Sequence, residues 1–177
     1  YTMFAFHGDV VAGMGPLSTD QVDAGQLPAW SSYVIVDDAD TVFAAAVELG
    51  ATPLLEPTQI LDTGTMFAIL DPVGAPVGFW QSGTHHGAGV FNEPGSLTWN
   101  DLATRDVEKA KTFYTHLLGW DVGEMPMGDR VYWTFSNAGR MNGGTWDMSG
   151  LLPDDLPSHW MPWFRVHDCS AMATRVA

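Results

Sequence analysis

The stretch that decides the fold is DVEKAKTFYTHLLGW, residues 106–120. Asp106 is a residue type that caps the start of a helix, and Gly119 is one that ends it. Between them, apolar side chains recur every three or four positions, which places them on one helix face. Those side chains are Val107, Ala110, Phe113, Tyr114, Leu117 and Leu118. The segment from Leu97 to Ala103 precedes them, so a strand followed by an amphipathic helix is predicted.

An earlier copy of this pattern continues into three more strands. The segment from Trp30 to Val36 reads as a strand, Asp38 as a helix cap, and Gly50 as the helix end. The helical stripe is Ala39, Val42, Phe43, Ala46 and Val47. Short strands are expected at Pro53–Leu55, at Met66–Leu70 and, after the DPVG turn at 71–74, up to Trp80. The predicted unit is therefore a βαβββ module.

A longer repeat extends the pattern in both directions. Four residues recur 131 positions later, and a second group recurs with an offset of 130. The first group is Tyr1, Phe4, Gly8 and Gly13, answered by Tyr132, Phe135, Gly139 and Gly144. The chain then reads as the end of module one, complete modules two and three, and the start of module four. We expect two paired-module domains, 1–81 and 96–177, a linker at 82–95, and a natural protein that is longer at both ends.

Composition narrows the possible partners. Twenty-one acidic against seven basic residues give a formal charge of −14, which opposes binding to nucleic acid or to an anionic membrane. The long uncharged stretch at 72–92 contains Gly, Pro and His, so it is not expected to span a membrane. The single cysteine, Cys169, cannot form an internal disulfide, and cytoplasmic localisation is expected. Either a monomer or a homodimer is compatible with the pattern.

The 106–120 motif and the DPVG turn closed by Trp80 resemble the glyoxalase, bleomycin-resistance and extradiol-dioxygenase (vicinal oxygen chelate) superfamily. The linker GTHHG at 83–87, followed by NEPG at 92–95, is similar to a narrower actinobacterial group of duplicated proteins, often labelled hydroxylase or glyoxalase. The resemblance covers the whole chain. It implies an α+β fold in which paired βαβββ modules curl into open cups that hold a small-molecule ligand.

The resemblance also implies where a metal would be held, because each module can supply an early His and a late Glu. The His positions correspond here to Ser31, Trp99 and Met161, and the Glu positions to Gly13, Gly78 and Gly144. None of these suits a hard divalent cation. We therefore expect no cofactor. A divalent metal on new ligands stays open, because the chain has six His residues.

Strand alternation predicts the lining of the cup. The expected ligand-binding residues are Ser31, Tyr33, Trp80, Trp99 and Trp163. An aromatic lining with few polar groups suits a flat or apolar molecule.

Three residues are candidates for chemistry. Asp101, in an apolar setting, could move protons near neutral pH, or could only cap a loop or pair with an Arg. Arg165 could hold a ligand oxygen or serve as the counter-ion of Asp101. Tyr132 could donate to a developing oxyanion, or could be a packing residue.

Three functions follow from this pattern. The first is a metal-independent protein that acts on a carbonyl or aromatic metabolite as a lyase or isomerase. The second is a binding protein that sequesters a drug without reacting with it. The third is a metal-dependent dioxygenase or hydroxylase, which needs ligands other than those at the family positions.

Overall fold

The computed structural model describes residues 1–23 and 25–176. Modules two and three each form a strand, a helix and three further strands. The module-two elements are β3 (Tyr33–Val36), α2 (Ala39–Glu48), β4 (Thr52–Ile60), β5 (Gly64–Leu70) and β6 (Pro76–Ser82). The module-three elements are β7 (Leu97–Thr104), α3 (Val107–Leu118), β8 (Asp121–Met127), β9 (Arg130–Asn137) and β10 (Arg140–Asp147). The predicted βαβββ order is confirmed.

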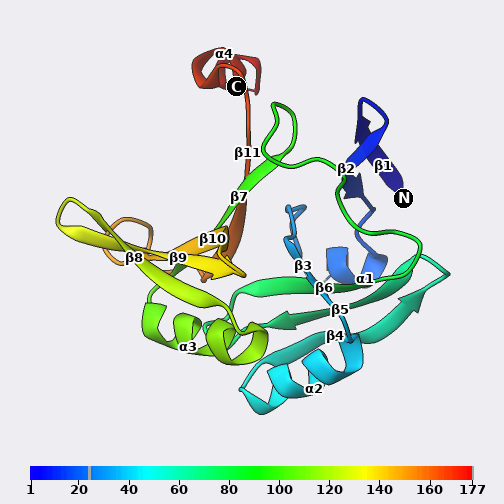
Figure 1. Cartoon of the computed structure of the whole chain (residues 1–177), viewed down its shortest axis with the longest axis horizontal. Helices are drawn as coiled ribbons and strands as arrows, with labels where there is room; N and C mark the ends of the chain where they lie inside the picture. The colour runs from blue at the N-terminus through cyan, green and yellow to red at the C-terminus, as the bar shows by residue number, and fades with distance from the viewer. Residues whose placement is uncertain (24, 177) are drawn as a thin grey trace. The chain divides into compact units, whose positions relative to one another are not determined.

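Both modules have the same sheet topology. The strand orders are β3-β6-β5-β4 and β11-β7-β10-β9-β8, where β11 is His159–Phe164. In each module the first strand lies parallel to the last, and the middle strands follow antiparallel (Figure 1). The mixed, open sheets confirm the predicted α+β fold.

The N-terminal hairpin repeats the β9–β10 hairpin in detail. Strands β1 (Thr2–Phe6) and β2 (Asp9–Met14) are joined at His7 and Gly8, both with positive φ (52° and 97°). Ala138 and Gly139 join β9 to β10 with φ of 49° and 75°. The registers also agree, because Met3 pairs with Gly13 as Thr134 pairs with Gly144. The 131-residue repeat is therefore structural as well as sequential.

The helix ends follow the predicted capping residues. Asp38 accepts a hydrogen bond from the Thr41 backbone N–H at 3.0 Å, and Asp106 accepts one from Lys109 at 3.0 Å. Gly119 ends α3 in the left-handed conformation, with φ of 66°. These contacts satisfy backbone groups that the first and last helical turns leave without partners.

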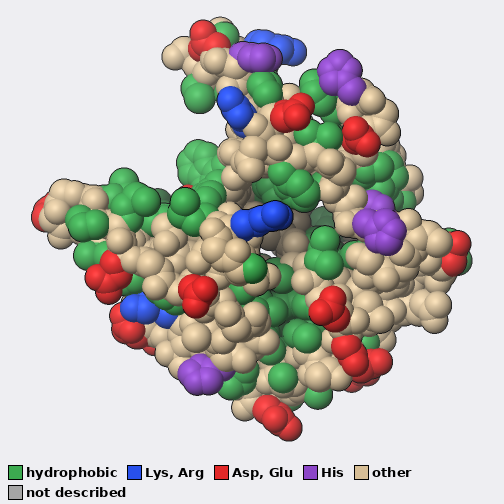
Figure 2. Space-filling model, viewed as in Figure 1, with side chains coloured by type: hydrophobic (Ala, Val, Ile, Leu, Met, Phe, Trp, Pro, Cys, Tyr) green, Lys and Arg blue, Asp and Glu red, His purple; other side chains and the backbone are tan. Residues whose placement is uncertain are grey.

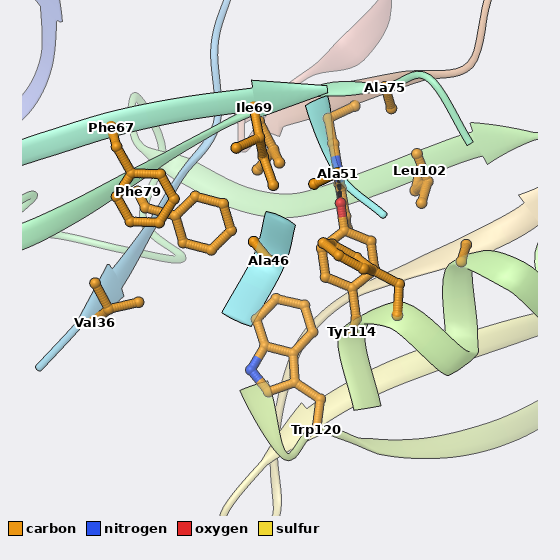
Figure 3. Close-up of a cluster of buried hydrophobic side chains, with 14 of the residues drawn as sticks. Val36, Ala46, Ala51, Phe67, Ile69, Ala75, Phe79, Leu102, Tyr114 and Trp120 are labelled. Carbon is orange, nitrogen blue, oxygen red and sulfur yellow. Dashed lines mark hydrogen bonds between the residues drawn. The ribbon is translucent and has the colours of Figure 1, made fainter. Parts of the chain in front are cut away.

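The chain divides into two compact units. One contains residues 1–30, 86–99 and the chain from Pro162 onward, and the other contains 31–85 and 100–161. The second unit holds the main core, in which the rings of Phe67 and Phe79 stack at 4.5 Å (Figure 3). Tyr114 reaches into this core from α3, beside Trp120. The predicted domains 1–81 and 96–177 stay a prediction.

Some predicted boundaries were wrong. Strand β3 begins at Tyr33 rather than Trp30, because its pairing with β6 begins opposite Gly78. In the predicted stripe of α2, Ala39 and Ala46 are buried, whereas Val47 is 41% exposed. Helix α1 (Thr19–Asp23) lies between the modules and is not among the predicted elements.

The C-terminal helix α4 covers Cys169–Val176. No helix in residues 1–23 or 25–176 has the length and apolar character needed to cross a membrane. Figure 2 shows acidic side chains scattered over the visible face with few basic ones among them, as the net charge predicts.

Candidate functional site

The register of module three places the candidate residues on one face of its sheet. Asp101 on β7 lies opposite Gly144 on β10, which pairs with Thr134 on β9 and, through it, with Gly123 on β8. The next row along the sheet contains Trp146, Tyr132 and Met125. Residues directly opposite each other point to the same side of a sheet. This face therefore combines a carboxylate, a phenol and a hydroxyl with an indole and a thioether.

Tyr132 and Asp101 are the two predicted catalytic residues that the structure brings into contact. The Tyr132 hydroxyl donates a short hydrogen bond to Asp101 Oδ1, and both side chains are half-buried. The phenol lies across Gly144, so that a Cβ atom added to this glycine would be 2.1 Å from Tyr132 Oη. The absence of a side chain at Gly144 is what lets the phenol reach the carboxylate.

A tyrosine also lies over a glycine at the other two family Glu positions, although in module two it comes from the first strand, where Tyr33 pairs directly with Gly78. A Cβ atom on Gly78 would be 2.5 Å from the Tyr33 ring, and one on Gly13 would be 2.1 Å from Tyr1 Oη. An aromatic ring over a cross-strand glycine covers an otherwise exposed backbone. In all three modules, a tyrosine therefore fills the space of a side chain at that position.

The tyrosines over these glycines bear on the metal site that the family resemblance implies. A carboxylate at position 78 or 144 would collide with Tyr33 or Tyr132. At the His positions stand Ser31, Trp99 and Met161, which offer no imidazole. No group of three His, Cys, Asp or Glu side chains with metal-binding geometry occurs within residues 1–23 and 25–176. The residues described at these positions do not fit the family metal site.

The predicted ligand-binding residues fall into separate groups. Tyr33 is 49% exposed, and Trp80, two residues beyond Gly78, is half-buried and donates its indole N–H to the His85 carbonyl at 2.9 Å. Ser31 is exposed and precedes β3. Trp99 lies two residues before Asp101 on β7 and is half-buried.

Two predicted residues lie on β11 or just after it. Trp163 is 48% exposed. Arg165 follows the strand and donates to the Asn92 carbonyl at 2.5 Å. Both belong to the unit that holds residues 86–99, whereas Asp101 and Tyr132 belong to the other. The predicted roles of Trp163 and Arg165 stay predictions.

A buried polar trio in the second unit was not predicted. Tyr114 Oη donates to Asp71 Oδ2 at 2.8 Å and accepts from Trp160 Nε1 at 2.9 Å. Burial raises the pKa of Asp71 above its usual value and raises the pKa of Tyr114 well above its own. Asp71 also accepts from the Val73 and Ala75 backbone N–H groups, which fixes the DPVG turn. The hydrogen bonds of the trio connect residues of modules two, three and four.

Comparisons with known proteins agree on the kind of fold. The family model of a bleomycin-resistance-protein-like N-terminal domain matches residues 96–134. A protein of Mycobacterium tuberculosis that carries the provisional name of a glyoxylase is 34% identical over 177 residues, which are 100% of this chain and 67% of that protein. An anthracycline biosynthesis protein of Streptomyces peucetius is 30% identical over 200 residues, covering 99% of this chain and 66% of that protein.

A solved structure resembles the fold at lower sequence identity. The Mn(II)-bound glyoxalase of Novosphingobium aromaticivorans superimposes with a TM-score of 0.52 at 16% identity, over 65% of this chain and 41% of that one. This likeness concerns the arrangement of strands and helices.

Proposed function

Because the chain belongs to the glyoxalase, bleomycin-resistance and extradiol-dioxygenase superfamily, we propose that it acts without a metal on a carbonyl or aromatic metabolite. The observation that carries this proposal is the hydrogen bond from Tyr132 to Asp101 across Gly144. The phenol lies over Gly144, the position where the family resemblance implies a metal-binding carboxylate in metal-using members. The proposed reaction is proton transfer, of the kind that lyases and isomerases use.

The ligand that we propose is a planar, oxygen-bearing aromatic compound. Trp146 lies in the same row as Tyr132. Indole rings provide large apolar contacts for flat molecules. The name of the Streptomyces relative points to anthracyclines, which are polycyclic ketones and phenols. A formal charge of −14 favours a neutral or cationic ligand over an anionic one.

In the proposed mechanism Asp101 is the base and Tyr132 is the hydrogen-bond donor to the developing oxyanion. Asp101 removes a proton from the carbon next to the ligand carbonyl. The C–H electron pair forms a C=C bond, and the π pair of the C=O bond moves to the oxygen to give an enolate. The newly protonated carboxyl then donates to Tyr132 Oη, which frees the phenol hydrogen to turn toward the enolate oxygen. Stabilising that oxygen lowers the barrier. Return of the proton to carbon regenerates the pair.

Solvent-deuterium exchange tests the proposal. The probe is α-tetralone, a bicyclic aryl ketone, and NMR follows deuterium uptake at the carbon next to its carbonyl. We expect the protein to accelerate uptake, and Asp101→Asn and Tyr132→Phe each to lower the rate about a hundredfold. Unchanged exchange in Asp101→Asn would remove this residue from the mechanism.

A non-catalytic binding protein is the second candidate. The contact that favours it is the same Tyr132 hydrogen bond, which also satisfies two half-buried polar groups without any reaction. Tetralone that binds, measured by tryptophan quenching, but does not exchange would favour sequestration. Exchange that depends on Asp101 would favour catalysis.

A further inference from the structure

A hydrogen bond from module two reaches the strand that carries Asp101. The Ser32 hydroxyl donates to Asn100 Oδ1 at 2.8 Å, and both residues are half-buried. Ser32 directly precedes β3, and its carbonyl accepts from the Gly78 backbone N–H of β6 at 3.0 Å. The backbone of Ser32 is therefore fixed to the module-two sheet, while its side chain contacts the module-three sheet.

Asn100 is the residue immediately before Asp101 on β7, at the point where β7 begins to pair with β10. The parallel register starts with Asp101 opposite Gly144. A Cβ atom on the preceding residue, Gly143, would be 2.5 Å from the Asn100 carbonyl oxygen, so the two backbones lie very close here. Neighbouring residues on a strand point to opposite faces. The Ser32 contact therefore holds β7 from the face opposite the Asp101 carboxylate.

We propose that Ser32 and Asn100 are positioning residues for the Tyr132–Asp101 pair. A displacement of reacting groups by about 1 Å can lower a rate about a hundredfold. By anchoring β7 at Asn100, module two keeps the Asp101 carboxylate within reach of the phenol that lies over Gly144. The inference rests on the proposed function for its effect on the reaction rate, but the Tyr132 hydrogen bond can be measured without any ligand.

The first readout is the hydrogen bond itself. Carbon-13 NMR of protein labelled at tyrosine Cζ reports the hydrogen bonding of each phenol, and Tyr132→Phe identifies the Tyr132 signal. Asp101→Asn then gives the position of that signal when the carboxylate is lost. We expect Ser32→Ala and Asn100→Ala each to move the signal part of the way toward this position. The double variant should move it no further than either single variant, because both changes remove the same contact.

The second readout is the exchange of α-tetralone. Ser32→Ala should lower the maximal exchange rate about tenfold, a smaller loss than in Asp101→Asn, because the carboxylate is still present but less well placed. The tetralone concentration that gives half the maximal rate should not change, because Ser32 acts through Asp101 and not on the ligand. Ser32→Thr keeps the hydroxyl group and should retain the wild-type rate.

Ser158→Ala is the matched control. The Ser158 hydroxyl donates to Thr104 Oγ1 at 3.1 Å, so this change also removes a half-buried serine hydrogen bond to β7, at the far end of the strand from Asn100. Both readouts should stay at their wild-type values in this variant. Equal losses in Ser158→Ala and Ser32→Ala would overturn the positioning role, since they would reflect a general loosening of the sheet.

Two further outcomes separate this inference from the proposed function. If Asp101→Asn abolishes exchange but Ser32→Ala does not slow it, or if Ser32→Ala does not move the Tyr132 signal, the positioning role is overturned and the proposed function stands. If the wild type does not exchange tetralone while Ser32→Ala still moves the Tyr132 signal, the proposed function fails and the role of Ser32 in placing the pair stands.

Discussion

The Tyr114 hydroxyl group makes two buried hydrogen bonds in the second unit, and removing it tests how much these bonds stabilise the fold. Tyr114 is fully buried, Asp71 is 3% exposed, and Trp160 is 9% exposed. In Tyr114→Phe the Asp71 carboxyl loses a donor and the Trp160 N–H loses its acceptor. Each buried group left without its partner costs about 1–3 kcal/mol, so the loss of both partners should lower the free energy of unfolding by about 2–6 kcal/mol.

Urea denaturation followed by circular dichroism measures this loss. For a chain of this size the thermal midpoint should fall by about 5–15 °C. Tyr33→Phe is the matched control, because Tyr33 is 49% exposed and its change should cost less than about 1 kcal/mol. A loss below about 1 kcal/mol in Tyr114→Phe would refute the reasoning, since water or a local shift would then be replacing both bonds.

Three other perturbations have defined outcomes. Burial raises the pKa of Asp71 in the folded state, so the stability of the wild type relative to Asp71→Asn should be greatest below pH 4 and should fall as the pH rises through that folded-state pKa. Urea titrations at a series of pH values measure this difference in the free energy of unfolding. A difference that does not change with pH would contradict the prediction. Gly144→Ala puts a Cβ atom 2.1 Å from the present position of Tyr132 Oη. The rate of tetralone exchange should therefore fall as in Tyr132→Phe, while the circular dichroism spectrum is retained. Exchange at the wild-type rate would show that the phenol need not lie across the glycine. Asp106→Ala removes the N-terminal cap of α3 and should lower the free energy of unfolding by about 1 kcal/mol. Asp129→Ala, in the β8–β9 turn, is the control. Equal losses in the two variants would argue against a stabilising role of the cap.

The repeat and the helix caps were predictable because their signals are local. Asp106 and Gly119 act within a turn of their own helix, and the 131-residue offset needs only the sequence compared with itself. Helix α1 was missed although its signal was present. Ser18 and Gln21 form a capping box, in which the Gln21 side chain accepts from the Ser18 N–H and the Ser18 hydroxyl accepts from the Gln21 N–H.

The candidate site was predictable only in part. Alternation along a strand indicates which side of the sheet Asp101 and Tyr132 occupy, but it gives no information on whether the phenol leans across Gly144. That pose depends on the register of strands β7, β10 and β9. This register pairs Asp101 with Gly144, which lies 43 positions later in the sequence. The partners of Asp71 were hidden for the same reason, since Tyr114 also follows it by 43 positions. The DPVG pattern indicates a turn and carries no information on what its carboxylate contacts.

Tyr132 and Asp101 are proposed to act on the ligand without a metal. The most direct measurement is the rate of α-tetralone exchange after dialysis against EDTA, compared with the rate after adding back Mn²⁺, Fe²⁺ or Zn²⁺. We predict equal rates in all four samples, with loss of exchange in Asp101→Asn. Exchange that EDTA abolishes and one of these ions restores would contradict the account.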